Sequence, residues 1–133
     1  MAAPFETVNV RYMVDDVAAA VDWYVACFGF EAVMSTPAFG SVALGNLRLL
    51  LSGRASSAGR PMPDGRQPEP GGWNRFQWIT DDIAADAERL RGLGVKFRNE
   101  ILSGPGGSQV LIEDPSGNVV ELFQPAANWQ PTR

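Results

Sequence analysis

The sequence contains no histidine and only one cysteine among its 133 residues. Without imidazole groups, the chain cannot supply the nitrogen ligands that zinc, nickel and iron sites favour. The single cysteine, Cys27, has no partner in the chain for a disulfide, which fits a reducing compartment, so we expect a cytoplasmic protein. No histidine is present to activate the thiol, so we do not expect Cys27 to be catalytic.

Basic runs and long apolar runs are also missing. The formal net charge is −4, and phosphate binding requires a clustered excess of Lys and Arg, so we expect no nucleic-acid partner. No stretch approaches the roughly 18 apolar residues of a membrane span, and the N-terminus lacks the pattern of a signal peptide. We therefore expect neither secretion by that route nor membrane insertion. Hydrophobic residues make up 45% and charged residues 20%, which is typical of a globular domain.

An internal repeat organises the chain. Val14-Asp15-Asp16-Val17 recurs as Thr80-Asp81-Asp82-Ile83. Each copy follows a β-type run, residues 8–14 and 75–80, and opens a helical pattern that ends before a glycine. The aspartates stand where a side chain can accept from free backbone N–H groups at a helix start. We interpret them as helix caps and assign them no catalysis.

Three further β-type runs follow each helical pattern. They span residues 30–34, 41–44 and 47–51 in the first half, and 95–97, 109–112 and 119–123 in the second. A Gly-Asn turn joins the last two runs of each half. The sequence therefore predicts an α+β fold of tandem βαβββ modules. We expect one domain over residues 1–133, with module one at about 6–52, a linker at about 53–71, module two at about 72–124 and a tail at 125–133.

This repeat resembles the vicinal oxygen chelate superfamily of glyoxalases, bleomycin resistance proteins and dioxygenases. The likeness also rests on Asp22-Trp23-Tyr24 and on Glu-Asp-Pro-Ser-Gly-Asn-Val-Val-Glu-Leu at residues 113–122, and it covers roughly residues 6–124. The resemblance implies that the modules form a curved mixed sheet around a cleft. In metal-dependent members, His and Glu side chains from the first and last strands of each unit bind one divalent ion.

The metal ligands of that pattern are absent here. The family positions of the two histidines fall on Asn9 and Arg75, and the carboxylate positions fall on one of Leu49 to Leu51 and on Glu121. A lone carboxylate beside an arginine is expected to form an ion pair instead of holding a metal. We therefore expect a metal-free pocket with no cofactor.

Strand alternation indicates which side chains face the cleft. Asn9, Arg11 and Met13 alternate with Val10, Tyr12 and Val14, which the helix should cover. An equally supported interpretation is that Arg11, Arg75 and Glu121 only form an ion-pair cluster in the place of a metal. Trp73 and Trp129 fit no core stripe and are candidates for stacking. The candidate ligand-binding residues are Asn9, Arg11, Met13, Phe39, Leu49, Leu50, Trp73, Arg75, Gln77, Glu121, Phe123 and Trp129.

Two functions remain open: a protein that sequesters a small molecule, and a metal-free enzyme of isomerase or lyase type using Glu121 with Arg11 or Arg75. Binding is favoured, because neighbouring arginines stabilise the charged carboxylate and so make it a weak base. We assign no catalytic residue. A third possibility is an accessory domain that binds another protein.

The chain is similar to the bleomycin-resistance branch of the superfamily. This similarity implies self-resistance through stoichiometric binding of an antibiotic, in a two-fold homodimer with clefts at the subunit interface. An aromatic or polyketide ligand, such as an enediyne, fits the expected cleft better than a cationic glycopeptide, since the cleft would hold two arginines and one glutamate.

Overall fold

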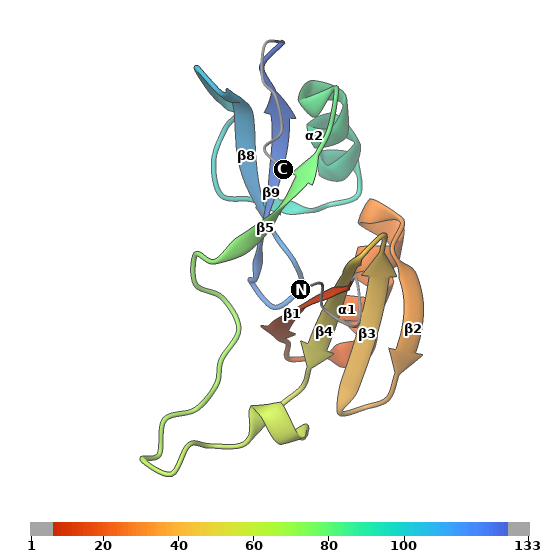
Figure 1. Ribbon diagram of the computed structural model, residues 1–133, viewed down its shortest axis with the longest axis vertical. Coiled ribbons are helices and arrows are strands. Elements are labelled where there is room, and N and C mark those ends of the chain that lie inside the picture. The colour runs from red at the N-terminus through yellow and green to blue at the C-terminus, as the bar shows by residue number, and fades with distance from the viewer. Residues whose placement is uncertain (1–6, 128–133) are drawn as a thin grey trace, which may run out of the picture. The chain divides into compact units, whose positions relative to one another are not determined.

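The computed structural model describes residues 7–127, which divide into two compact units (Figure 1). The first unit extends to Gly71 and includes Pro115–Asn118, and the second comprises Gly72–Asp114 and resumes at Val119. Within residues 7–127, no helix is long and apolar enough to cross a membrane.

The first unit is a four-stranded sheet with one helix. Its elements are β1 (Val8–Met13), α1 (Val17–Phe28), β2 (Glu31–Ser35), β3 (Phe39–Leu44) and β4 (Leu47–Ser52). The strand order is β1-β4-β3-β2, in which β1 runs parallel to β4 and the other neighbours are antiparallel. The helix α1 packs on one face of this sheet (Figure 1).

The start and end of α1 follow from its cap residues. The Asp16 side chain accepts a hydrogen bond from the Ala19 N–H at 3.0 Å, and Gly29 ends the helix in the left-handed conformation, at φ 70°. Between them, most apolar residues at helical spacing are buried, as the helical pattern in the sequence indicated, whereas Val25 is 40% exposed. The buried residues are Val17, Ala20, Val21, Tyr24, Cys27 and Phe28.

The second unit repeats this order with one addition. Its elements are β5 (Arg75–Ile79), α2 (Ile83–Gly92), β6 (Lys96–Phe97), β7 (Leu102–Gly104), β8 (Gly107–Glu113) and β9 (Val119–Pro125). The strand order is β5-β9-β8-β6, β7 pairs with β8, and β5 runs parallel to β9. The expected α+β fold is confirmed, while the short strand β7 was not predicted.

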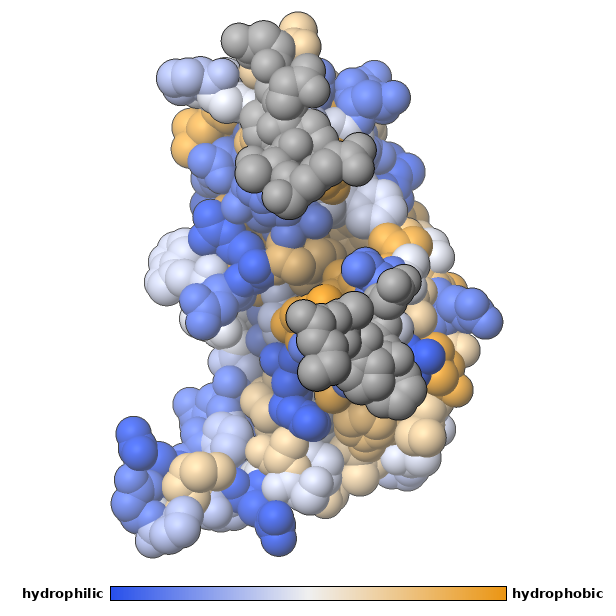
Figure 2. Space-filling view, in the orientation of Figure 1, coloured by the Kyte–Doolittle hydropathy of each residue, from blue (hydrophilic) through white to orange (hydrophobic). Residues whose placement is uncertain are grey.

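The segment between β4 and β5 carries a single helical turn, η1 (Ser57–Gly59). The Ser56 hydroxyl donates to the Gly53 carbonyl at 2.6 Å and accepts from the Gly59 N–H at 3.2 Å. Figure 2 shows this segment mostly in the hydrophilic colours. Side-chain bonds to the backbone thus organise the first part of a segment with little apolar content.

Asn118, in the turn between β8 and β9, is tied into the first unit. Gly117 adopts the positive φ of this turn, at 86°. The Asn118 Nδ2 donates to the Met13 carbonyl at 2.7 Å, and its Oδ1 accepts from the Gly71 N–H at 2.9 Å. The side chain therefore anchors both the end of β1 and the end of the long segment.

Strand register shows which residues share a face in the first unit. Val10, Leu49 and Val42 lie opposite one another, and Leu49 and Val42 are fully buried. Arg11, Leu50 and Ser41 lie opposite one another on the other face. Leu50, and not Leu49, therefore shares its face with Arg11.

This register predicts unequal effects of two adjacent substitutions. We expect Leu49→Ala to lower the free energy of unfolding by about 2–5 kcal/mol, because it leaves a cavity beside α1. Leu50→Ala should cost less than about 1.5 kcal/mol, since Leu50 is only half-buried. Urea unfolding of both variants measures the difference, and equal losses would contradict the register.

Candidate functional site

The structure places most of the twelve candidate residues on two sheet faces, one in each unit. Asn9, Arg11, Met13, Phe39 and Leu50 share the face of the first sheet that α1 does not cover. Leu49 lies on the helix-covered face with none of its surface exposed, so its burial removes it from the candidate set. Trp129 lies outside the described residues.

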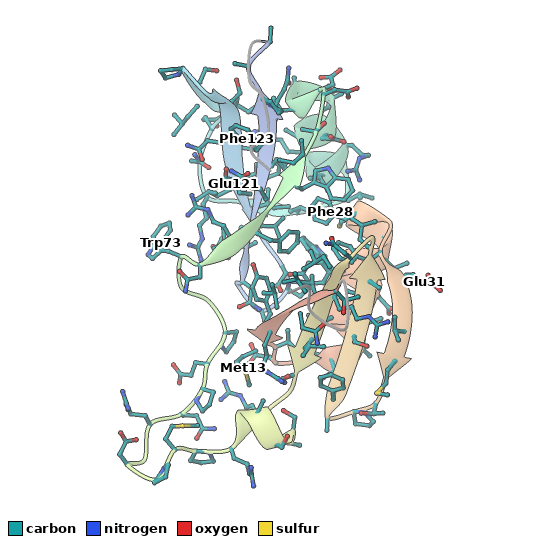
Figure 3. The ribbon with its side chains drawn as sticks, in the orientation of Figure 1. Met13, Phe28, Glu31, Trp73, Glu121 and Phe123 are labelled. Carbon is teal, nitrogen blue, oxygen red and sulfur yellow. The ribbon has the colours of Figure 1, made fainter. Side chains whose placement is uncertain are left out.

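In the second unit, Arg75, Gln77, Glu121 and Phe123 share one face, which we call the Glu121 face. It comprises the side chains of β5, β9 and β8 that lie on the same side as Glu121: Arg75, Gln77, Ile79, Val119, Glu121, Phe123, Gln109, Leu111 and Glu113. The residues that alternate with them include Val110, Ile112, Val120 and Leu122, all fully buried. Trp73 lies two residues before β5, and Figure 3 labels it together with Glu121 and Phe123.

Glu121 is the centre of this face. The carboxylate is buried, with 5% of the residue exposed, and both of its oxygens accept hydrogen bonds. Arg75 Nε donates to Oε1 at 2.9 Å, and Gln77 Nε2 donates to Oε2 at 2.7 Å. Arg75 Nη1 also donates to the Trp73 carbonyl at 3.2 Å, which links Trp73, two residues before β5, to the same group. A charged and an amide donor thus balance a carboxylate that would otherwise be costly to bury.

These residues do not fit a divalent metal ion. Arg75 brings a positive charge to a position where a metal would need a ligand, and the two Glu121 oxygens are already engaged. The chain has no histidine, and within residues 7–127 no group of three or more Cys, Asp or Glu side chains is placed to share an ion. No step in the chemistry of this face is therefore assigned to a metal.

Arg11 has a partner in its own unit that the sequence did not predict. Its Nη1 donates to the Ser52 hydroxyl at 2.8 Å, and Ser52 is fully buried at the end of β4. The only sequence signal was a serine directly after the apolar run of β4. Of the expected cluster of Arg11, Arg75 and Glu121, the structure shows the Arg75–Glu121 ion pair, whereas Arg11 donates to Ser52. Gln77 is the second donor to Glu121.

Trp73 stacks on a second arginine. The Arg98 guanidinium carbon lies 4.5 Å from the centre of the indole ring, and 67% of Trp73 is exposed. Arg98 Nε pairs with the Glu113 carboxylate at 2.8 Å, and its Nη1 donates to the Gly72 carbonyl at 2.8 Å. Sequence reasoning missed Arg98 and Glu113, although their opposite charges, one directly after β6 and the other at the end of β8, were a usable signal.

Phe123 lines a small pocket beside the Glu121 face. Leu102, Gln109 and the glycines of the β7–β8 hairpin also line this pocket, whose volume is about 300 Å³. Leu102 is 56% exposed, so apolar surface is available here. These residues were missed because β7 was not predicted.

A larger hollow of about 630 Å³ lies where β5 ends, and Trp78, Thr80, Asp81 and Asp86 contribute to its lining. It contains none of the candidate residues. The Thr80 hydroxyl donates to the Asp86 carboxylate at 2.5 Å, and the Asp82 side chain accepts from the Ala85 N–H to cap α2. Two of the aspartates around this helix start therefore have structural roles.

Known proteins with similar sequences and structures agree with this fold. Residues 7–122 match the Glyoxalase/Bleomycin resistance protein/Dioxygenase superfamily. No curated protein matches the chain.

Three solved structures are similar. TnmS3, an antibiotic binding protein from Streptomyces sp. CB03234, is 29% identical, with 95% of this chain and 99% of that chain covered and a TM-score of 0.71. Lactoylglutathione lyase from Agrobacterium tumefaciens is 25% identical, with coverages of 92% and 96% and a TM-score of 0.68. TioX from Micromonospora sp. ML1, at 18% identity, coverages of 90% and 98% and a TM-score of 0.71, shows the fold alone.

The Arg75–Glu121 pair predicts a coupling between two substitutions. Arg75→Leu leaves a buried carboxylate with Gln77 as its remaining side-chain donor, so we expect a loss of about 2–4 kcal/mol in the free energy of unfolding. Combining it with Glu121→Leu removes the stranded charge and should recover at least about 1 kcal/mol of the summed losses. Urea unfolding of the two single variants and the double variant measures this coupling, and strictly additive losses would show that the pair is not formed.

Because the residues around Glu121 do not fit a metal ion, we expect divalent ions to leave the melting temperature of the protein unchanged. After EDTA treatment, we expect the addition of Zn²⁺, Ni²⁺, Mn²⁺ or Mg²⁺ to change the melting temperature by less than about 1 °C. Differential scanning fluorimetry measures this, with Glu88→Gln, which neutralises an exposed carboxylate on α2, as the control variant. A metal-dependent rise that Glu121→Gln abolishes and Glu88→Gln retains would contradict the expectation.

Proposed function

The chain belongs to the Glyoxalase/Bleomycin resistance protein/Dioxygenase superfamily, and we propose that it binds and sequesters an aromatic or polyketide natural product, such as an antibiotic, without a metal ion. The observation that carries the proposal is the buried Glu121 carboxylate, whose two oxygens are held by Arg75 and Gln77. A carboxylate whose two oxygens are both engaged is held in one orientation and can act as a fixed polar anchor beside a ligand.

Apolar and aromatic side chains border this polar centre. On the Glu121 face, Ile79 is 52% exposed, and Phe123 lies beside it in the register of β5 and β9. Trp73 and Leu102 add exposed apolar surface at the edges. A large planar ligand would pack on these side chains, and the fixed polar groups would set its orientation.

The face of the first sheet that α1 does not cover has a similar mixture of apolar and polar side chains. Met13, Phe39 and Leu50 supply apolar contacts, and Asn9 and Arg11 supply polar ones. The bond from Arg11 to Ser52 holds the guanidinium close to the sheet. We include these five residues in the proposed binding site and assign none of them a catalytic role.

The named relatives support binding and leave a second candidate. TnmS3 is described as an antibiotic binding protein, and another similar structure is a lactoylglutathione lyase. The alternative for this chain is a metal-free isomerase or lyase in which Glu121 acts as the base and Arg75 or Arg11 stabilises an anion. The two hydrogen bonds to Glu121 favour binding over this alternative, because both carboxylate oxygens are already engaged by protein donors. Self-resistance in the cytoplasm, by a homodimer with clefts at the subunit interface, is the setting that we propose.

The proposal predicts stoichiometric, metal-independent binding of a neutral aromatic polyketide. With EDTA-treated protein, we expect daunomycinone to quench tryptophan fluorescence, bind at one molecule per chain in equilibrium dialysis and be recovered unchanged by mass spectrometry. Trp73→Ala should weaken binding about tenfold through the loss of stacking. Leu93→Ala is the matched control, because Leu93 is 57% exposed at the end of α2 and belongs to neither candidate face.

Two outcomes would count against this function. If the recovered compound were altered, and Glu121→Gln abolished the change, the enzyme would be the correct assignment. If neither daunomycinone nor bleomycin, a cationic glycopeptide, bound to the protein, the sequestration of such antibiotics would be refuted. Under the binding proposal, Glu121→Gln weakens binding only modestly, because Gln is the same size and keeps one acceptor oxygen.

A further inference from the structure

The Glu121 face changes character along its strands. Three cross-strand rows follow from the registers of β5, β9 and β8: Arg75–Val119–Glu113, then Gln77–Glu121–Leu111, then Ile79–Phe123–Gln109. Charged groups dominate the first row, and apolar groups dominate the third. Lys96 extends the first row, and Leu102 extends the third. The face therefore has a charged end and an apolar end, which suits a ligand with the same division.

The charged end carries an excess of positive charge. Three cations, Arg75, Lys96 and Arg98, share two carboxylates, Glu113 and Glu121. Glu113 alone pairs with both Lys96, at 3.6 Å, and Arg98, at 2.8 Å. This local excess stands against a net charge of −4 for the whole chain. An anionic group is therefore favoured at this end of the face in a protein that repels anions on average.

Arg75, in the first row, has one guanidinium nitrogen without a hydrogen-bond partner in the described part of the chain. Its Nε and Nη1 bind Glu121 and the Trp73 carbonyl, and within residues 7–127 its Nη2 makes no further hydrogen bond. Its side chain is 30% exposed, so a ligand can reach it. A guanidinium held by two bonds can donate to a carboxylate or phenolate with little loss of side-chain entropy.

Trp73 is held at the same end as a platform with one covered and one exposed face. Arg98 covers one side of the indole, and Glu113 together with the Gly72 carbonyl fixes the Arg98 side chain, which is only 18% exposed. A planar ring stacked on the other side of the indole would lie about 8 Å from the guanidinium, within the Debye length at physiological ionic strength. The guanidinium therefore adds a positive potential to the stacking surface.

We propose that the Glu121 face selects planar aromatic ligands that carry a negative charge, and that Arg98 and Glu113 are positioning residues that set this preference by holding Trp73. The proposal rests on the small-molecule binding function above and adds the chemical class of the ligand. The aromatic rings stack on Trp73 and extend toward Phe123 and Leu102, and the anionic group binds Arg75.

Three pyrene derivatives that differ in charge test the class of ligand. Pyrene-1-carboxylate, pyrene-1-methanol and pyrene-1-methylammonium share one ring system, and their binding to the EDTA-treated full chain is followed by energy transfer from tryptophan to pyrene. We expect the carboxylate to bind about tenfold more tightly than the alcohol, and the ammonium to bind more weakly than both. The preference should shrink as NaCl is raised from about 0.05 M to about 0.5 M, because salt screens the charges.

Two arginine variants test the role of Arg98. Arg98→Gln should reduce the preference for the carboxylate over the alcohol to about threefold. Arg91→Gln is the matched control, since the Arg91 guanidinium carbon lies 4.4 Å from the centre of the Phe97 ring and its Nη2 pairs with Glu100 at 3.7 Å. It should leave the preference unchanged. If Arg98→Gln does not fold, the pyrene series and its salt dependence on the wild-type chain decide the question of ligand charge.

The outcomes separate this inference from the proposed function. If daunomycinone binds but the pyrene carboxylate and alcohol bind equally, or the ammonium binds best, the charge preference is wrong and sequestration stands. An equal effect of Arg91→Gln and Arg98→Gln would overturn the positioning role of Arg98. If neither daunomycinone nor any pyrene binds, the proposed function itself fails, and this inference fails with it.

Discussion

The arrangement of the second unit depends on one buried carboxylate. Glu121 lies on β9 with 5% of its surface exposed, and a charge in that position is tolerated only when donors surround it. Arg75 and Gln77 provide these donors from β5, because the parallel pairing of β5 with β9 places the three side chains on one face. The carboxylate in turn fixes Arg75, whose second bond holds the backbone of Trp73. The parallel pairing of β5 with β9 therefore positions both the polar group around Glu121 and the nearby Trp73.

The two units use one scaffold for different chemistry. In each, the first strand pairs in parallel with the last, so that Arg11 opposite Leu50 corresponds to Gln77 opposite Glu121. The first unit has no carboxylate at this place, and its arginine instead donates to the buried hydroxyl of Ser52. Duplication explains why the strands correspond, and the substitution at two paired positions explains why only one unit holds a buried ion pair. The proposed specificity for charge therefore belongs to the second unit.

Periodicity in the sequence predicted the elements of the fold and most of the two faces. Both helices have clear apolar spacing and capping aspartates, and strand alternation placed Asn9, Arg11, Arg75 and Gln77 on the correct sides. These features are local, so a single sequence contains them. The register of three consecutive leucines could not be predicted, because an unbroken apolar run has no alternation to read.

Long-range side-chain contacts were beyond the reach of such patterns. Arg98 stacks on Trp73, 25 positions away, and Asn118 bonds to Met13, 105 positions away. These contacts depend on how separate strands pair and on how a turn is anchored. Neither of these produces a periodic pattern in the sequence. The strand β7 was missed for a related reason, since a three-residue strand that ends in glycine has too little pattern for detection.

The most direct test of this account is a map of ligand contacts in solution. In ¹H–¹⁵N spectra of the EDTA-treated protein titrated with daunomycinone, we predict shifts in the indole N–H of Trp73 and in the side-chain amides of Gln77 and Gln109. The indole N–H of Trp23, on α1, should stay in place. Shifts confined to residues of the hollow at Thr80 and Asp86, with Trp73 and Gln77 unchanged, would contradict the assignment of the Glu121 face as the binding surface.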